Sequence, residues 1–592
     1  MRGMHPPDKK KIKELMDVSM GRQKADLVIV GGDVLNVYTG ELLRSWSVAI
    51  KGQRIAYVGD DAGHTMGQDT EIIDASGRIL IPGLIDGHTH LLMYYTLSEF
   101  LKYAMRGGTT TIVSEAIELA FPYGYEGIVE FLDSAKDQPI KIFATVPPMS
   151  SISRAGQAAA IDTSRLKTLL HREDVVGLGE TVWSDAIRGD KNIFSLFAET
   201  LKTGKRIEGH AAGARGIRLA SFISTGVSSC HESTTVEEVI ERLRLGIHTM
   251  IREGDIRAEL EVISKIKDMD IDFRRLVLVT DGVGPERLIT DGYMEYVVQR
   301  AIDFGFDPIT AIQMATLNPA EHFGLDHMIG GIAPSRYADI VIIPDLKKIN
   351  AELVISNGQV IARERELLVQ PRECNYMKRP FASIDIPRKL NADDFVVRTN
   401  VGAGPVRARV IDLTTPLVTH EKIVEVSHLS DEIQMDIERD ILKVAAVTCG
   451  HEGMSRFVGL IRGFGIKRGA FATSAVWDVS AIVVVGAHEK DMAKAVNRIV
   501  ELRGGIVVIA DGKILAELAM PVGGIVSDQP LGTIAQRLDE IQQGVKGLGC
   551  QLPDAHLSLS ILTTPYIPFL RISEEGLVDL KNGRKVNLII SE

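Results

Sequence analysis

Two histidines in the segment Pro82-Gly-Leu-Ile-Asp-Gly-His88-Thr-His90 are well placed to bind a metal ion. In an extended segment, side chains at positions i and i+2 point to the same side, so both imidazoles can reach one cation. Asp86, two residues before the first histidine, can support the pair through a hydrogen bond. Because His-x-His pairs also occur on solvent-exposed strands, the meaning of this pair depends on the other potential ligands.

More side chains that can bind a metal follow other apolar, strand-length runs of the sequence. They are Glu115, Glu118, Glu180, His210, His231, Glu253 and Asp281. Each of them alone is better explained as a helix cap or a hydrogen-bonded polar residue. Their repeated position after strand-length runs, however, indicates one shared site. Neutral imidazoles together with carboxylates suit zinc, manganese or iron(II) rather than calcium.

The apolar runs alternate with helix-like segments, which is the pattern of repeated strand–helix units. We expect eight strands, at Ile81–His90, Thr109–Glu115, Ile140–Val146, Val175–Glu180, Arg206–Ala211, Gly226–Glu232, Thr249–Gly254 and Leu276–Gly282. We expect helices between them, at Tyr125–Lys136, Arg165–Arg172, Asn192–Thr203, Thr235–Leu245 and Ile256–Lys267. This alternation predicts a (β/α)8 TIM-type barrel, whose active site lies at the carboxyl ends of the strands. Such a barrel brings the potential ligands together.

The remaining segments predict three further parts of an α/β protein. Residues 1–24 form a charged N-terminal helical extension, and residues 25–82 and 328–365 form a small β domain that flanks the barrel. The barrel occupies residues 83–327 and ends in a helix at Pro308–Gly324. Residues 366–592, rich in Val/Ile runs and Gly turns, form a C-terminal mixed α/β domain.

Length and composition limit the class of protein. A chain of 592 residues is too long for one hydrophobic core, and 45% hydrophobic with 24% charged residues is typical of a globular enzyme. The net charge of -11 argues against a nucleic-acid partner. The four cysteines are scattered without a C-x-x-C pair, which favours a reducing compartment. We expect no signal peptide and no membrane partner, because the apolar runs are only strand-length, and hence a cytoplasmic protein.

An ordered series of motifs resembles the adenine deaminase family of the amidohydrolase superfamily. The His-x-His pair, the histidines after the fifth and sixth strands and the aspartate after the eighth match the metal pattern of the superfamily. Motifs similar to the adenine deaminase family are Gly107-Gly-Thr-Thr-Thr, Gly177-Leu-Gly-Glu180, Cys230-His-Glu-Ser-Thr-Thr, Met250-Ile-Arg-Glu-Gly254, Ala315-Thr-Leu-Asn-Pro-Ala320, Ala475-Val-Trp-Asp478 and Met520-Pro-Val-Gly-Gly-Ile-Val-Ser-Asp528. The resemblance runs from about residue 25 to the end of the chain.

The resemblance implies a metal-dependent hydrolysis that converts adenine to hypoxanthine and ammonia, a step of purine salvage. One or two divalent transition metals per chain are implied, manganese first, with iron(II) or zinc as alternatives. His88 and His90 would hold one metal with Asp281, and His210 and His231 the other, with Glu180 bridging the two. The metal supplies hydroxide for attack on C6 by lowering the pKa of water from about 15.7 toward 7.

The same resemblance implies the remaining catalytic roles and partners. Asp281 would take the water proton, and Glu253 or Glu118 would protonate the ring. The partner is a small purine base, and a homo-oligomer is expected.

The sequence departs from this family at several positions. Leu91-Leu92 replaces an Ile-Glu pair, and Glu115-Ala-Ile117-Glu118 replaces Asp-Pro-His-Glu. Gly282 and Tyr293 replace a second aspartate and a histidine. These changes leave another aminopurine or a cyclic amide as the alternative substrate. A metal-free, non-catalytic relative is a further alternative, but such relatives lack several of the histidines that this chain keeps.

Overall fold

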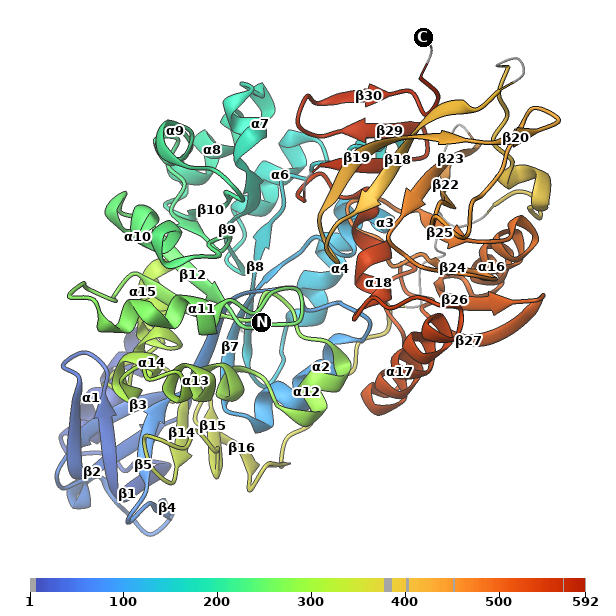
Figure 1. The fold of residues 1–592 in the computed structure, drawn as a ribbon. Helices are drawn as coiled ribbons and strands as arrows, with labels where there is room; N and C mark the ends of the chain where they lie inside the picture. The colour runs from blue at the N-terminus through green and yellow to red at the C-terminus, as the bar shows by residue number, and fades with distance from the viewer. Residues whose placement is uncertain (1–6, 377–385, 401–403, 451–452, 568, 591–592) are drawn as a thin grey trace.

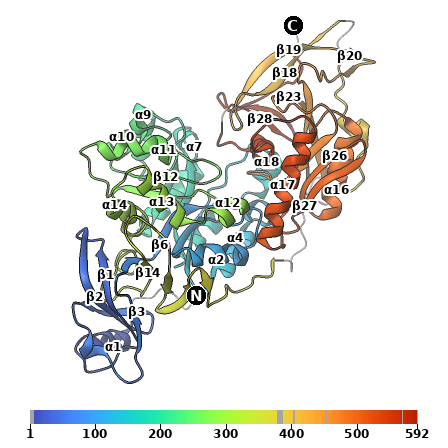
Figure 2. The same cartoon turned by 60° about the horizontal axis from the view of Figure 1, so that its bottom comes forward.

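The chain folds into a central barrel with a sheet domain at one end and a larger α/β domain at the other (Figures 1 and 2). The computed structural model describes residues 7–376, 386–400, 404–450, 453–567 and 569–590. Helix α1 (Lys9–Ser19), capped by Asp8, packs against the sheet domain. Within the described residues, no helix is both long and apolar enough to cross a membrane.

The barrel is built from eight parallel strands that follow one another in chain order, as predicted. They are β6 (Leu84–Thr89), β7 (Thr109–Glu115), β8 (Lys141–Val146), β9 (Val175–Val182), β10 (Arg206–His210), β11 (Ser229–Cys230), β12 (His248–Arg252) and β13 (Leu276–Val279). The last strand lies beside the first, where the Asp281 amide donates to the His88 carbonyl oxygen at 3.1 Å. This contact nearly closes the barrel and joins two predicted ligands through the backbone.

Helices cover the outside of the barrel and bury their apolar faces against the strands. They include α2 (Leu97–Arg106), α3 (Ala120–Tyr123), α4 (Tyr125–Ala135), α5 (Arg154–Ala159), α6 (Thr163–Leu170), α7 (Trp183–Ile187), α8 (Lys191–Lys202), α9 (Gly216–Ile223), α10 (Val236–Arg244), α12 (Pro285–Thr290) and α13 (Met294–Asp303). Side-chain oxygens of Thr96, Asp162 and Asp190 cap the first turns of α2, α6 and α8.

Two predicted helices differ from the structure. The segment Ile256–Lys267 contains only α11 (Leu260–Ile263) followed by a 3-10 turn, because the preceding residues form a bridge with Glu253. The segment Pro308–Gly324 is divided into α14 (Pro308–Met314) and α15 (Leu317–His322), since Thr316 leaves the helical conformation at φ -140°.

The sheet domain takes its strands from both sides of the barrel in sequence. Its order is β17-β16-β15-β14-β5-β1-β2-β3, with β4 beside β1. The strands are β1 (Leu27–Asn36), β2 (Glu41–Lys51), β3 (Arg54–Gly59), β4 (Glu71–Asp74), β5 (Ile79–Pro82), β14 (Ile340–Ile343), β15 (Leu353–Ser356), β16 (Gln359–Arg363) and β17 (Glu366–Leu367).

The predicted first barrel strand at Ile81–His90 is therefore wrong at its start. The chain passes from β5 of the sheet domain to β6 of the barrel at Gly83. A β-carbon at this position would lie 2.1 Å from the Thr110 hydroxyl, so only glycine allows the close crossing. An apolar run that serves two sheets cannot be divided by periodicity alone.

The C-terminal domain is a mixed α/β unit with one eight-stranded sheet in the order β19-β18-β23-β22-β25-β24-β26-β27. The strands are β18 (Val406–Leu413), β19 (Thr419–Val426), β22 (Leu442–Gly450), β23 (Gly453–Arg462), β24 (Ala470–Thr473), β25 (Ile482–Gly486), β26 (Gly505–Ala510) and β27 (Lys513–Ala519). A small hairpin, a three-stranded sheet and three helices complete it: β20 (His428–Leu429), β21 (Glu432–Ile433), β28 (Leu570–Ser573), β29 (Gly576–Asp579), β30 (Arg584–Val586), α16 (Glu489–Leu502), α17 (Leu531–Gly547) and α18 (Ala555–Ser560).

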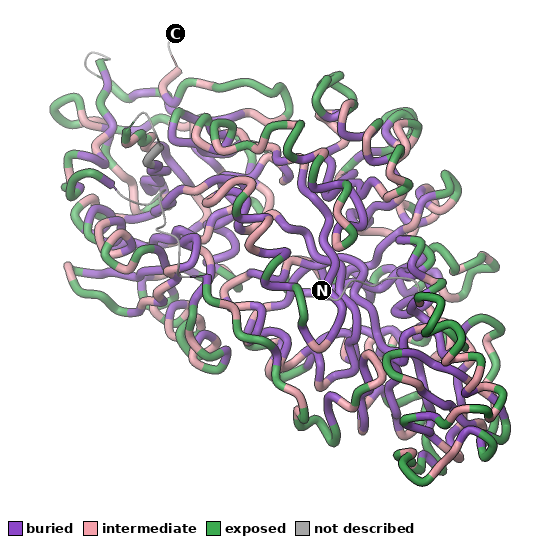
Figure 3. The backbone as a smooth tube through the Cα atoms, turned by 180° about the vertical axis from the view of Figure 1, so that it is seen from behind, coloured by how far each residue is buried: buried purple, intermediate pink, exposed green. Residues whose placement is uncertain are grey.

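The C-terminal domain packs directly on the barrel. The Ser527 amide donates to the Tyr94 carbonyl oxygen at 2.8 Å, and the Gly523 amide donates to the Tyr123 hydroxyl at 3.1 Å. Figure 3 shows that the buried chain continues from the barrel into this domain. The two parts therefore share a buried interface above the barrel strands.

We predict that the buried ion pair of Lys141 and Asp339 stabilises the junction of the barrel and the sheet domain. The ammonium lies 2.7 Å from both carboxylate oxygens, and each residue is 5% exposed. Asp339→Ala should lower the free energy of unfolding by about 3–5 kcal/mol, because it leaves the Lys141 charge buried and unpaired. Denaturant unfolding followed by circular dichroism measures this.

The double variant Lys141→Met/Asp339→Ala should recover part of the loss, because both charges are then absent. Asp268→Ala, which removes an exposed partner of Lys267, is the matched control and should change stability little. An unchanged stability of Asp339→Ala would contradict the role of the pair.

Candidate metal centre

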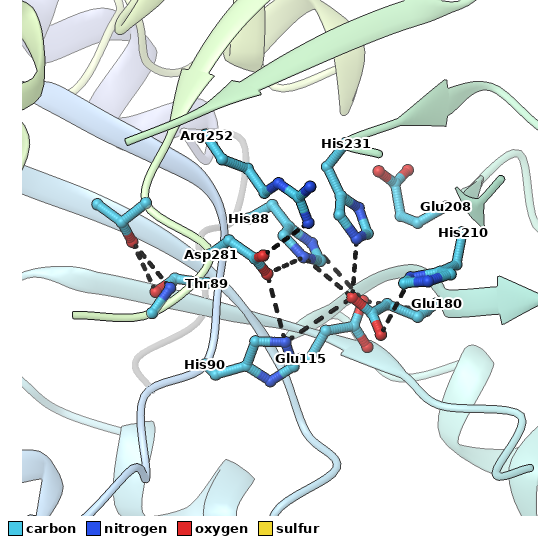
Figure 4. A network of polar contacts seen from close by, with 12 residues as sticks. His88, Thr89, His90, Glu115, Glu180, Glu208, His210, His231, Arg252 and Asp281 are labelled. Atoms are coloured by element: carbon cyan, nitrogen blue, oxygen red, sulfur yellow. Dashed lines mark hydrogen bonds and ion pairs between the residues drawn. The ribbon is translucent and has the colours of Figure 1, made fainter. Parts of the chain in front are cut away.

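Six predicted ligands lie at the carboxyl ends of five barrel strands and face one another (Figure 4). His88 lies in β6 and His90 directly after it, while Glu180 lies in β9. The other three are His210 at the end of β10, His231 after β11 and Asp281 after β13. The structure thus brings together all of the residues predicted to bind metal.

One group of potential ligand atoms comes from His88, His90, Glu180 and Asp281. The Nε2 atom of His88 lies 3.2 Å from an Asp281 oxygen and 3.3 Å from a Glu180 oxygen. The Nε2 atom of His90 lies 3.6 Å and 3.8 Å from the same two oxygens. One cation could contact all four residues.

A second group comes from Glu180, His210 and His231. The Nε2 atom of His231 lies 3.0 Å from one Glu180 oxygen, and the Nδ1 atom of His210 lies 3.9 Å from the other. The atoms within each group lie within 4.8 Å of one another. Glu180 belongs to both groups, which is the arrangement of a bridging carboxylate.

The donor set fits a divalent transition metal. Imidazole nitrogens and carboxylate oxygens are the ligands that zinc, manganese and iron(II) accept. Both ring nitrogens of His210 are buried and lack a hydrogen-bond partner among the described residues, which is costly unless a ligand satisfies them. The site therefore provides the ligands that two adjacent cations require.

Strong electrostatic coupling also characterises the centre. Burial alone would raise the pKa of Glu180, but the surrounding imidazoles hold it well below its usual value. Burial alone would lower the pKa of His88, whereas the Asp281 and Glu180 carboxylates raise it to about 10. Such closely spaced charges of both signs are typical of functional sites.

Arg252 holds the Asp281 carboxylate from the side. This arginine is the last residue of β12 and is 2% exposed. It donates to an Asp281 oxygen at 3.1 Å and also pairs with Glu232 and Glu259. Asp281 itself has a left-handed backbone with φ +58°, and the contact with Arg252 fixes its side chain in this unusual position.

Asp86 ties the first and last barrel strands together beneath the ligands. Its carboxylate accepts hydrogen bonds from the His88 amide at 3.1 Å and from the Thr280 hydroxyl at 2.6 Å. The Tyr293 hydroxyl donates to the same carboxylate at 2.6 Å. Tyr293, one of the departures from the family pattern, thus supports the metal centre from below and does not line the cavity.

The structure separates the two predicted ring-protonating acids. Glu118 lines the cavity, and its carboxylate accepts a hydrogen bond from the Nδ1 atom of His90 at 2.9 Å. Glu253 does not line the cavity, and its carboxylate pairs with Arg287 at 3.1 Å. Neighbouring residues at a strand end point in opposite directions, so Arg252 and not Glu253 faces the centre.

A cavity lies above the ligands, between the barrel and the C-terminal domain. The barrel contributes His90, Leu92, Ile117, Glu118 and Phe121 beside the metal ligands. The C-terminal domain contributes Val476, Trp477, Asp478, Ile525 and Tyr566. Of the departures from the family pattern, Leu92 and Ile117 line this cavity, whereas Leu91 does not.

Sequence reasoning missed several of these residues. Arg252 stands next to Glu253 in a quoted motif, so strand alternation could have indicated it, whereas Glu232 follows His231 after the end of β11 and both line the cavity. Asp478 stands in the motif Ala475-Val-Trp-Asp478, but its position over the barrel depends on how two domains pack. No local pattern carries that information.

The comparisons with known proteins agree with this geometry. Fold and site define a metal-dependent hydrolase, and the profile of the amidohydrolase family matches residues 79–361. The profile of the adenine deaminase C-terminal domain matches residues 416–584. A solved β-aspartyl dipeptidase from Fervidobacterium islandicum is 18% identical, with a TM-score of 0.47, covering 58% of this chain and 97% of its own.

Two curated relatives match the whole chain. The adenine deaminase of Moorella thermoacetica is 36% identical over 98% of both chains. Adenine deaminase 3 of Rhizobium meliloti is 35% identical over 97% of this chain and 98% of its own. The chain belongs to the adenine deaminase family and is a hydrolytic enzyme.

We predict that replacing either histidine of the second group lowers the metal content. His210→Ala or His231→Ala should reduce the bound divalent metal, measured by mass spectrometry of purified protein after dialysis. His171→Ala, an exposed histidine that pairs with Glu199, is the control and should leave the content unchanged. Equal metal content in all four proteins would refute the assignment.

Proposed function

We propose that this protein hydrolyses adenine to hypoxanthine and ammonia, using one or two divalent metals. The observation that carries the proposal is the cluster of six candidate metal ligands, five of which, all except His88, line one cavity. Full-length similarity to adenine deaminases directs this chemistry to an aminopurine. Manganese is our first choice of metal, with iron(II) or zinc as alternatives, and release of hypoxanthine would serve purine salvage.

A bound divalent ion supplies hydroxide at neutral pH by lowering the pKa of water from 15.7 to about 7. Asp281 accepts the water proton, because its carboxylate is fixed by Arg252 and reaches the cavity. It then passes the proton toward the leaving amine, as a general acid–base residue does. A rigid carboxylate performs this transfer without reorganisation.

Glu118 is the better candidate to protonate the ring. It lines the cavity, whereas Glu253 is held by Arg287 outside it. The hydrogen bond to His90 also orients that imidazole, so Glu118 supports the ligand geometry as well.

The cavity wall suits a flat heteroaromatic base. Apolar and aromatic side chains surround the polar floor: Leu92, Ile117, Phe121, Val476, Trp477 and Ile525. Small-molecule sites typically combine such walls with a few polar groups that fix orientation. The wall also excludes water from the reacting carbon.

A related aminopurine is the second candidate substrate. Leu92 and Ile117 present apolar side chains to the cavity at positions where the family resemblance implies polar ones. Polar groups that hydrogen-bond a base discriminate strongly between different bases. Their loss can therefore change which base is bound while the metal centre stays intact.

We predict that the manganese-loaded protein releases ammonia from adenine and forms hypoxanthine, followed by its ultraviolet spectrum. Iron(II)- and zinc-loaded protein should be assayed in parallel, with other aminopurines and cyclic amides as comparison substrates. Turnover of a cyclic amide without turnover of adenine would refute the proposal. Turnover of another aminopurine alone would support the second candidate.

Asp281→Asn should lower kcat by about 10²–10⁴-fold, because the amide keeps the shape but cannot accept a proton. Asp268→Asn, an exposed aspartate of the same barrel beside Lys267, is the control. Circular dichroism and metal content should accompany the kinetics, so that a loss of proton transfer is separated from a loss of metal. Activity within a few-fold of wild type would place the proton transfer elsewhere.

A further inference from the structure

The roof of the cavity belongs to the C-terminal domain and has its own polar groups. Most of its described lining is apolar or small, but it includes the carboxyl of Asp478 and the hydroxyl of Tyr566. Asp478 is 7% exposed and Tyr566 is 8% exposed. Neither residue belongs to the groups of potential metal ligands, so metal binding does not account for their burial above the centre.

The loop that carries Asp478 is fixed in place from both domains. Its backbone is left-handed with φ +63°, a conformation that aspartate adopts more readily than most other residues. The Ser151 hydroxyl of the barrel donates to the Asp478 carbonyl oxygen at 2.8 Å. The Thr563 hydroxyl donates to the Trp477 carbonyl oxygen at 2.6 Å. These contacts hold the side chain of Asp478 at the cavity.

The polar atoms of this roof are incompletely satisfied. The Thr564 hydroxyl donates to one carboxylate oxygen of Asp478, and no described residue donates to the other. The Tyr566 hydroxyl is buried without a hydrogen-bond partner among the described residues, while its ring packs on His210 at 5.1 Å. A buried polar group without a partner costs about 1–3 kcal/mol unless a ligand satisfies it.

Electrostatic interactions link Asp478 to the potential metal ligands on the opposite side of the cavity. Burial raises the pKa of Asp478 to about 7; the negative charge of Glu180 also raises it, whereas His210 and His90 lower it. The second oxygen of Asp478 can accept a hydrogen bond from a ligand, and the Tyr566 hydroxyl can donate or accept one. A purine edge offers the complement, a ring nitrogen that accepts beside an N–H group that donates.

We propose that Asp478 and Tyr566 hydrogen-bond the edge of the substrate base, so that the C-terminal domain supplies base recognition to the barrel. This inference rests on the proposed function. The barrel then carries out the hydrolysis, and Asp478 and Tyr566 of the C-terminal domain determine which purine is bound. Trp477 and Val476, on the same loop, supply the apolar contact beside these two polar groups.

Steady-state kinetics on adenine with the manganese-loaded, full-length protein tests this assignment. Asp478→Ala should raise KM about 10- to 100-fold with a smaller change in kcat, because the base loses an anchor. Asp478→Asn should recover most of the loss, since the amide oxygen can still accept a hydrogen bond from the base. Tyr566→Phe, which preserves the packing on His210, should raise KM about 3- to 10-fold.

Two comparisons separate recognition from a structural role. Thr564→Val removes the hydroxyl that donates to Asp478 and accepts from the Tyr566 amide, but it leaves both side chains at the cavity, so it should affect KM less than Asp478→Ala does. Asp539→Ala, an exposed aspartate of the same domain, should change nothing. Calorimetric titration with hypoxanthine should rank the binding affinities of Asp478→Ala, Asp478→Asn and Tyr566→Phe in the same order as their KM values.

The outcomes distinguish this inference from the function on which it rests. If wild type deaminates adenine while Tyr566→Phe and a folded Asp478→Ala both keep kcat/KM within twofold, the roof assignment alone is overturned. Equal losses in Thr564→Val and Asp478→Ala also overturn it, because they indicate a structural role. If wild type neither deaminates adenine nor binds hypoxanthine, the proposed function fails and the assignment fails with it.

Discussion

The carboxylate of Glu180, surrounded by four imidazoles, is the contact on which the whole site depends. Its two oxygens face both groups of potential ligands, so one side chain near the carboxyl end of β9 sets the spacing between them. Burying so many ionisable groups together is unfavourable unless cations or hydrogen bonds compensate. The centre therefore requires strict positions from every strand that contributes to it.

Those positions come from the way the barrel closes. Asp86 holds the backbone of His88 and the hydroxyl of Thr280, and Arg252 holds Asp281. These groups lie beneath or beside the ligands, and each links one strand to another. The C-terminal domain then covers part of the mouth of the barrel, so that residues of both domains line one cavity.

The fold could be predicted from sequence because eight apolar runs alternate with helix-like segments. The clustering of the six candidate ligands could be predicted because barrel topology brings strand ends together. The boundary at Gly83 could not, since one apolar run serves two sheets. The positions of Asp478 and Tyr566 could not either, because they depend on the packing of two domains. Sequence patterns describe single elements, whereas these features arise between elements.

The metal stoichiometry of a Glu180 variant tests the central claim most directly. Metal-free wild type and Glu180→Gln, each confirmed as folded by circular dichroism, can be titrated with manganese by calorimetry. Since Glu180 belongs to both ligand groups, the variant should lose affinity at every site that wild type shows. Unchanged stoichiometry and affinity in Glu180→Gln would contradict the view that this carboxylate organises the centre.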